Sequence, residues 1–353
     1  MRFLSVLLSV PVLSYASADI GFNLDIDAYA QPVSINAFTS NWHDTLKSGD
    51  KAFLQSRAEL FTQNSHRQLS LLWRYDYLLD FSEQTAQLYH AYANDKLPIA
   101  NQVYPLKINA KYSETYGIRW LQKFKATPLL TWAIGLNLLK GYKLTNGQID
   151  GDVLFQQPSF AVKDIKNAQL DVFYHYDEPQ LQEQQLEWHP RNPNGLGFSI
   201  DAEVNWQPLS NLALNLTLYD VYGRLYWQDV ATTQYNLSCD CSLYKHNIEG
   251  ELAIDSHYTQ YLSTHGQLSI DYHYDAAWSV GLKSRFNQQI ALWQPSIAYQ
   301  YKTWQTRFLV EPQTNSLGIQ IKNPYVYLRW LADDLNTNQA HRLGLSLGIY
   351  KVW

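Results

Sequence analysis

The sequence predicts an all-β protein, an antiparallel transmembrane β-barrel of about 14 to 18 strands with about 16 as the central value. Three observations support this fold class. Segments in which apolar and polar residues alternate recur along the chain, and aromatic residues make up 14% of it, with 26 Tyr and 12 Trp. After the first 18 residues, no apolar run reaches the length of roughly 18 residues that a membrane-spanning helix needs.

Alternation is clearest in the segment from Phe198 to Trp206, where the even positions are apolar and the odd ones include Asp201 and Glu203. A hairpin connection at residues 207–210 leads to a second such segment at 212–218, and similar patterns cover residues 69–77, 170–176, 268–274, 278–286 and 304–310. A soluble β-sandwich also alternates. Segment length, aromatic segment ends, and acids and bases together on the polar face favour the membrane barrel.

The start of the chain has the features of a secretory signal peptide over residues 1–18. Arg2 precedes an apolar run, and Ala16-Ser17-Ala18 forms a small-x-small cleavage site, so we expect cleavage after Ala18 and a mature chain beginning at Asp19. Residues 19–51 are less regular and are interpreted as a periplasmic lead-in, a first strand or a small plug. Residues 52–353 form the predicted barrel, and no linker marks a further domain.

The end of the chain carries a distinct pattern. Leu343, Leu345, Leu347 and Ile349 alternate with polar or small residues, and the chain stops at Trp353. Here the sequence resembles the outer-membrane β-barrel superfamily of Gram-negative bacteria, in which an aromatic residue ends the last strand. The resemblance implies an outer-membrane location, contact with outer-membrane lipids, and recognition of Leu345, Leu347, Ile349 and Trp353 by the barrel-assembly machinery. Lys351 departs from the pattern, since an apolar residue is usual there.

If the C-terminus is periplasmic, counting strands back from it predicts the side of the membrane on which each connection lies. Pro312–Ser316 is then periplasmic, and Ala332–Ala340 is outside. Two long external loops are expected, at Asp95–Ala110 and at Thr232–Asn247. Asn323-Pro324 fits either a kink within a strand or a turn between two strands.

The predicted inner face of the barrel collects charges of both signs. Either they line a water-filled pore and set its ion preference, or they pair across strands and fill a closed, structural barrel. The candidate lumen-lining residues are Arg57, Glu59, Arg74, Asp76, Arg119, Asp201, Glu203, Asp271, Lys283, Arg285 and Arg307, with Glu249, Glu251 and Asp255 assigned to the same face.

Other kinds of site have weaker support. Cys239 and Cys241 form the only cysteine pair, a candidate disulfide or thiol pair in a loop, and four-ligand zinc spacing is absent. No metal or other cofactor is expected. Nucleic acid is not an expected partner, because the net charge is −5 and no basic cluster is present.

Catalysis was considered for Asp255-Ser256-His257. Strand alternation would send Ser256 to the opposite face from its two neighbours, so we expect no local triad and no catalytic residues.

Three functions remain open at this stage. The first is a passive channel or uptake porin for small hydrophilic solutes. The second is a non-conducting component of an envelope export or surface-structure assembly system, which would hold an envelope protein partner. The third, an outer-membrane lipid or ester hydrolase, has the least support in the sequence.

Overall fold

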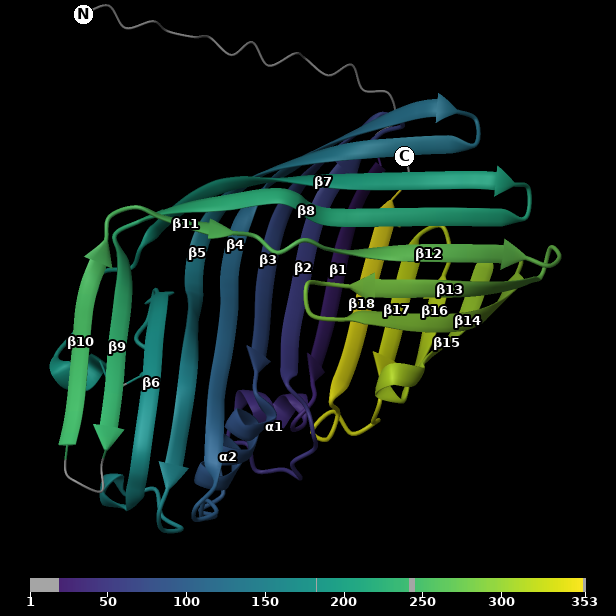
Figure 1. Ribbon diagram of the computed structural model, residues 1–353. Helices are drawn as coiled ribbons and strands as arrows, with labels where there is room; N and C mark the ends of the chain where they lie inside the picture. The colour runs from purple at the N-terminus through teal and green to yellow at the C-terminus, as the bar shows by residue number, and fades with distance from the viewer. Residues whose placement is uncertain (1–18, 182, 241–244, 352–353) are drawn as a thin grey trace, which may run out of the picture.

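A computed structural model describes residues 19–181, 183–240 and 245–351. Fourteen antiparallel strands close into a ring, because each pairs with the next and β18 returns to β1, with Ile20 opposite Lys351 (Figure 1). The ring strands are β1 (Asp19–Ala30), β2 (Lys51–Gln63), β3 (Arg67–Phe81), β4 (Val103–Thr127), β5 (Leu130–Phe155), β7 (Asn194–Leu209), β8 (Leu212–Gln228), β12 (His265–His273), β13 (Trp278–Phe286), β14 (Ala291–Tyr301), β15 (Trp304–Glu311), β16 (Ser316–Lys322), β17 (Val326–Ala332) and β18 (Arg342–Lys351).

The predicted fold class is therefore confirmed, whereas the central value of 16 strands is wrong. Part of the excess comes from strands that lie outside the ring, namely β6 (Ile165–Tyr176), β9 (Val230–Asp240) and β10 (Lys245–Asp255). The short β11 (Tyr258–Tyr261) adds to it, because it pairs with β8 in line with β12. These strands alternate as the ring strands do, so the sequence pattern does not separate the two sets. Residues 19–30 belong to the ring as β1, which is one of the three interpretations given for residues 19–51.

The two ends of the barrel differ in the length of their connections. The end that holds Lys351 has short turns, such as residues 128–129, 210–211 and 302–303, and we call it the short-turn end. At the other, long-loop end, residues 31–50 carry α1 (Ile35–Thr39) and residues 82–102 carry α2 (Glu83–Ala93). Outer-membrane barrels have short periplasmic turns and longer external loops, which assigns the short-turn end to the periplasm.

One connection lies at the opposite end from the one expected. Asn323 accepts hydrogen bonds from the backbone N–H groups of Tyr325 and Val326, so Asn323-Pro324 is a turn between β16 and β17. This reversal places η4 (Pro312–Thr314) at the long-loop end, together with residues 333–341. The periplasmic assignment of Pro312–Ser316 is wrong because that count passed through Asn323-Pro324 without reversing direction.

The sheet extends beyond the ring at the long-loop end. β5 pairs with β7 through Leu130–Gly141 and then with β6 through Thr145–Phe155, and β6 continues to β9 and β10 (Figure 1). We call β6, β9, β10 and the adjacent halves of β4 and β5 the wing. Strand therefore makes up half of the first expected long loop, because β4 begins at Val103, and most of the second, because residues 232–240 belong to β9 and residues 245–247 to β10.

Apolar clusters hold the wing and the loops in place. One face of the wing packs Tyr104, Val153, Phe155, Ala168 and Cys239 together. The ends of β1 to β3 and α2 form another cluster of Ala30, Ala52, Phe81 and Ala86. The short turns η1 (Val162–Asp164) and η2 (Glu183–Leu186) precede β6 and β7, respectively. Among the described residues, no helix combines the length and the apolar character needed to cross a membrane.

Two glycines make room for the largest buried side chain of the interior. Trp227 on β8 is 1% exposed, and a Cβ built on Gly141 or Gly195 would lie 2.4 or 2.6 Å from its indole ring. Its indole N–H donates to Gln260 at 3.1 Å. We expect Gly195→Val to destabilise the folded barrel by about 1–3 kcal/mol through overpacking. Urea unfolding followed by tryptophan fluorescence would measure this loss.

The same measurement on Gly195→Val combined with Trp227→Leu provides the control. Because the smaller side chain frees the space that the valine needs, the double variant should lose less stability than the sum of the two single variants. Simple additivity of the two losses would contradict this account of the glycine slot.

Candidate functional site

Ion pairs join strands that are not neighbours and close one side of the lumen. Arg74 on β3 pairs with Asp220 on β8, although β4, β5 and β7 lie between these strands in the ring. Arg119 on β4 contacts Asp201 at 3.0 Å and Glu203 at 2.8 Å, both on β7. We call this set the charged layer; its members are Arg57, Glu59, Arg74, Asp76, Arg119, Asp201, Glu203 and Asp220.

Local backbone features bring the charged layer together. A Cβ on Gly135 of β5 would lie 3.1 Å from Asp201 and 3.2 Å from Arg119, so the glycine leaves space for the guanidinium to reach β7. On β8, the pairing with β7 jumps from Tyr222 to Leu218, and Asp220 takes a left-handed φ of 53° within this bulge. The bulge turns Asp220 inward, where its N–H donates to Asp201 and its carboxylate meets Arg74.

Apolar side chains fill the space beside the charged layer. Leu72, Leu139, Leu144, Leu225 and Trp227 form a buried cluster contributed by β3, β5 and β8. This side of the barrel interior is therefore packed like a protein core. Any passage for a solute has to run along the other side, between β1 and β12 to β18.

Two cavities lie on that other side. The wider one, of about 530 Å³, reaches the turn at Asn323-Pro324 on the short-turn end and is lined by Lys283, Lys322 and Tyr327, among others. The narrower one, of about 60 Å³, is lined toward the long-loop end by Phe53, Ile290 and Leu292. Asp25, Tyr219, Gln267 and Arg285 line both cavities, and we call these four residues the junction.

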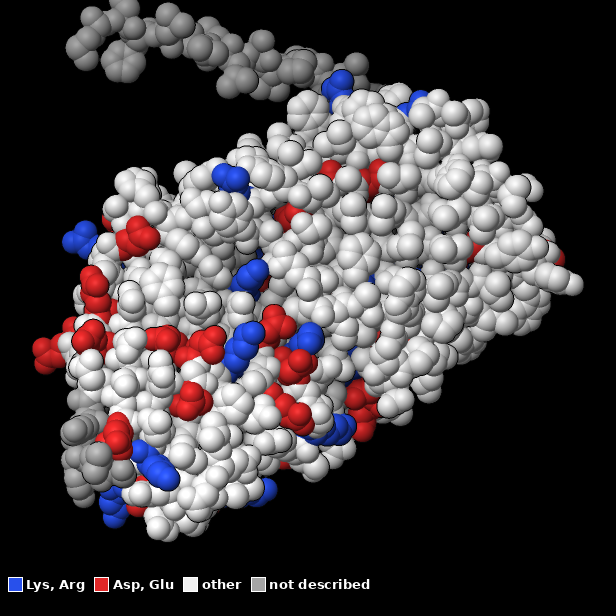
Figure 2. All heavy atoms as spheres, in the orientation of Figure 1, with Lys and Arg blue, Asp and Glu red and all other residues white. Residues whose placement is uncertain are grey.

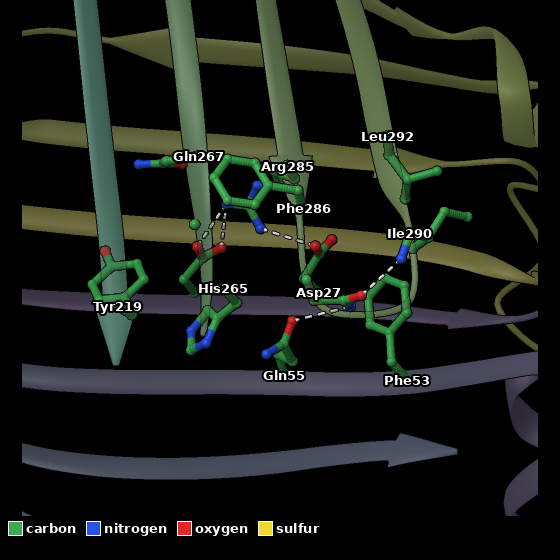
Figure 3. A pocket seen from close by; sticks show the side chains of 13 residues that line it. Asp27, Phe53, Gln55, Tyr219, His265, Gln267, Arg285, Phe286, Ile290 and Leu292 are labelled. Atoms are coloured by element: carbon green, nitrogen blue, oxygen red, sulfur yellow. Dashed lines mark hydrogen bonds and ion pairs between the residues drawn. The ribbon is translucent and has the colours of Figure 1, made fainter. Parts of the chain in front are cut away.

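The Arg285 side chain crosses the lumen at the junction. Its Nη2 lies 2.9 and 2.6 Å from the two carboxylate oxygens of Asp25 on β1, and its Nη1 lies 3.4 Å from Asp27 (Figure 3). β13 and β1 are separated in the ring by five other strands. One bidentate ion pair therefore separates the wider cavity from the narrower one.

The narrower cavity is closed at the long-loop end. Phe53 and Leu292 are buried and pack with Leu78 and Ile290. The connection at residues 287–290 reaches across the lumen, because Gln288 accepts a hydrogen bond from the Lys111 ammonium at 3.1 Å and another from Ser263 at 3.1 Å. We call Phe53, Leu78, Ile290 and Leu292 the apolar seal.

The wall formed by β14 to β18 holds a further buried network. Arg342 and Glu311 are both 0% exposed and form a bidentate pair, with Nε to Oε1 at 2.7 Å. Gln294 donates to Glu311 and accepts from Arg329 at 3.0 Å. Arg342 also contacts Asp27 at 2.5 Å, which links this network to the junction.

The structure places the eleven candidate lumen residues on inward-facing positions of ring strands. Seven of these residues lie together in the charged layer, and Arg285 lies at the junction. Asp271 pairs with Arg307 at 2.6 Å, and Lys283 lines the wider cavity. Glu249, Glu251 and Asp255 were wrongly assigned to the lumen, because β10 lies in the wing, outside the ring. The inner face of the ring extends into one face of the wing, which explains the shared alternation.

Several residues of the site were missed by the sequence reasoning. Asp25 and Asp27 alternate with Leu24 and Ile26, a signal that would have placed them inward had residues 19–51 been accepted as a strand. Arg329, Arg342 and Glu311 likewise occupy the polar positions of alternating segments. The bulge that turns Asp220 inward carries no such signal, since Asp220 follows Tyr219 without a glycine or proline.

The Asp255-Ser256-His257 cluster does not form a triad. Ser256 Oγ lies 3.0 Å from His257 Nδ1, so the expectation that these two side chains could not meet is wrong: they lie in a turn after β10. However, Asp255 accepts from the backbone N–H of His257 rather than from its imidazole, and its other oxygen lies 3.4 Å from His175. Burial lowers the pKa of His175 despite this carboxylate. No orienting acid contacts the His257 ring among the described residues.

Two further candidate features lie partly outside the described residues. Cys239 is buried in the wing, but Cys241 lies outside the described part, so their pairing stays a prediction. The signal peptide at residues 1–18 and Trp353 also lie outside it. Leu345, Leu347 and Ile349 occupy outward positions of β18, opposite the buried Ser346 and Gly348.

The outer surface of the ring is apolar across its middle and aromatic toward both ends. Leu69, Leu138, Val280 and Phe308 are exposed there. Phe124 stacks on Trp132 near the short-turn end, and Tyr75 packs against Tyr112 toward the long-loop end. Apolar side chains outside and charged ones inside, on a ring of strands that closes on itself, suit a ring surrounded by lipid. The fold is that of an outer-membrane β-barrel.

No protein-family model and no curated protein sequence matches the chain. Solved structures resemble this barrel weakly. The CymD monoaromatic hydrocarbon channel aligns at TM-score 0.45 and 9% identity over 96% of this chain and 88% of that one. The Pseudomonas putida toluene transporter TodX aligns at 0.41 and 9% over 96% and 90%, and a Pseudomonas aeruginosa FadL homologue at 0.37 and 9% over 95% and 88%. These values are too low to carry an argument about function.

Proposed function

We propose that this barrel is an outer-membrane passage for small polar solutes, which is closed in this structure. The observation that carries the proposal is the interior on the side of β12 to β18, where two cavities follow one another and share the four junction residues. The Arg285–Asp25 pair lies where the two cavities meet. A ring of purely structural purpose would be expected to pack this side as it packs the other.

Polar lining supports a hydrophilic solute. The wider cavity is bordered by Asn23, Gln63, Lys283 and Tyr350 as well as by the junction, and few of its side chains are aliphatic. Burying a hydrocarbon against charged and amide groups would leave those groups without water, at a cost of roughly 1–3 kcal/mol for each group. We therefore favour polar over apolar solutes for this path.

A non-conducting role in envelope assembly is the second candidate, and two observations favour it. The charged layer closes one side of the lumen, and the apolar seal closes the narrower cavity toward the long-loop end. In that case, the wing would be the part that holds another protein. The two candidates differ in one measurable property, which is ion conductance.

The test is single-channel conductance of the refolded mature chain in a planar bilayer. We expect brief, infrequent openings from the unchanged protein and longer openings from Asp25→Asn combined with Arg285→Gln, because these amides remove the attraction that holds the two walls together. The control is Glu178→Gln with Lys143→Gln, which removes a surface ion pair between β5 in the wing and the connection after β6. Folded barrels that remain silent in all three forms would exclude the passage and favour the assembly role.

A further inference from the structure

Hydrogen-bond donors without protein partners gather at the junction. Among the described residues, the Lys283 ammonium forms neither an ion pair nor a hydrogen bond, although the side chain lies in the wider cavity. The Tyr219 hydroxyl and the Gln267 amide line both cavities and form no hydrogen bond within the described chain (Figure 3). Lys283 and Arg285 are two residues apart on one face of β13, so their Cα atoms are roughly 7 Å apart.

The acids of this region are already neutralised. Asp25 accepts from both Arg285 and Ser346, the latter at 2.8 Å, and Asp27 contacts Arg342 at 2.5 Å. No carboxylate of the described chain lies within ion-pair distance of Lys283. Lys283 therefore has no ion-pair partner of its own within the described chain.

A second buried cationic side chain, that of Arg329, belongs to the same side of the barrel as the wider cavity. Arg329 on β17 is 0% exposed, and its only hydrogen bond is to Gln294, so its Nε and Nη1 donors are buried without a partner. Arg329 lies opposite Ser346 of β18, and the Ser346 hydroxyl donates to Asp25, so Arg329 lies beside the junction. Burying unpaired donors of a charged group is costly unless an anion compensates.

We propose that the junction and Lys283 form a binding site for small oxyanions, the class of ligand that carries a carboxylate or phosphate group. The Lys283 ammonium would supply the charge, and the Tyr219 hydroxyl and Gln267 amide would donate to the oxygens. The buried Arg329 adds positive potential in a region of low dielectric constant. This proposal deepens the proposed function, on which its transport aspect rests, by naming the solute class that the passage selects.

Selectivity is measured as the reversal potential across a salt gradient, on the refolded full mature chain. We expect the unchanged barrel to prefer anions, Lys283→Gln to lose most of that preference, and Lys283→Glu to prefer cations. The matched control is Lys302→Glu, which makes the same charge change in the exposed turn between β14 and β15. Acetate and inorganic phosphate, each compared with chloride, distinguish carboxylate from phosphate as the favoured oxyanion.

A binding measurement separates failure of the site from failure of the passage. Titration calorimetry of the folded barrel in detergent with sodium acetate or phosphate should show saturable binding that Lys283→Gln abolishes and Lys302→Gln retains. A conducting barrel that prefers cations overturns the oxyanion site and leaves the passage. A silent barrel that binds oxyanions through Lys283 retains the site and excludes the passage. Equal titration curves for the unchanged protein and Lys283→Gln overturn the site.

Discussion

Replacing Arg342 by methionine is expected to destabilise the folded barrel by about 3–5 kcal/mol. The change leaves Glu311, which is 0% exposed, without its bidentate partner, and it removes one of the two arginines that contact Asp27. The cost arises from a buried charge left uncompensated rather than from the net value of the pair. Equilibrium unfolding in urea, with lipid vesicles present and tryptophan fluorescence as the signal, would measure it.

Two further variants make this first prediction specific. Arg342→Met combined with Glu311→Leu should recover part of the loss, because neither partner is then left charged inside the wall. Arg67→Met removes an exposed arginine at the start of β3 and should change stability by less than about 0.5 kcal/mol. If the double variant is less stable than Arg342→Met, the loss stems from packing and the ion-pair explanation is wrong.

Opening the apolar seal should have the second large effect. In the background of Asp25→Asn with Arg285→Gln, Phe53→Ala removes the largest side chain between the narrower cavity and the long-loop end. If the seal contributes about 1.4 kcal/mol to the barrier for ions, conductance rises about tenfold. Planar-bilayer recordings on the triple and double variants would show it.

The control for this substitution lies on the same strand. Phe61 also faces inward on β2 and is also 4% exposed, but it packs against Gly21 and Tyr350 near the short-turn end. Phe61→Ala removes the same ring from a position that lines neither cavity, and it should leave conductance near that of the background. Equal effects of the two substitutions would mean that conductance follows the general loosening of the barrel.

The sequence predicts correctly which face of its strand a side chain occupies, because that depends only on the alternation within the strand itself. The period of two fixes which face of a strand is apolar, so Arg74, Asp201 and Arg285 could be assigned to the inner face without any knowledge of the neighbouring strands. The fold class followed from the same pattern. Strand number did not, because β6, β9 and β10 of the wing show the same alternation as the strands of the ring.

The partners of these residues could not be read from the sequence. Whether Arg74 meets Asp220 depends on how closely β3 approaches β8 across the lumen, and that approach depends on the β8 bulge and on the space left by Gly135. The turn at Asn323-Pro324 is formed by hydrogen bonds from two neighbouring N–H groups to the Asn323 side chain. That turn reverses the chain and so determines the end of the barrel at which η4 lies. Alternation assigns faces, whereas distances across the lumen depend on the whole ring.

The wing presents acidic residues to water at the long-loop end. Asp150 and Asp171 lie opposite one another on β5 and β6, and Glu249 and Glu251 are exposed on β10; Figure 2 shows acidic side chains gathered over this region. Within the described chain, β10 pairs with β9 alone and forms the outer edge of the sheet (Figure 1).

An open strand edge can pair with the same edge of a second molecule and start aggregation. Here such pairing would bring Glu249 and Glu251 of one copy against those of the other, and like charges on opposing strands are unfavourable. The acidic side chains of β10 thus oppose the joining of two such sheets edge to edge.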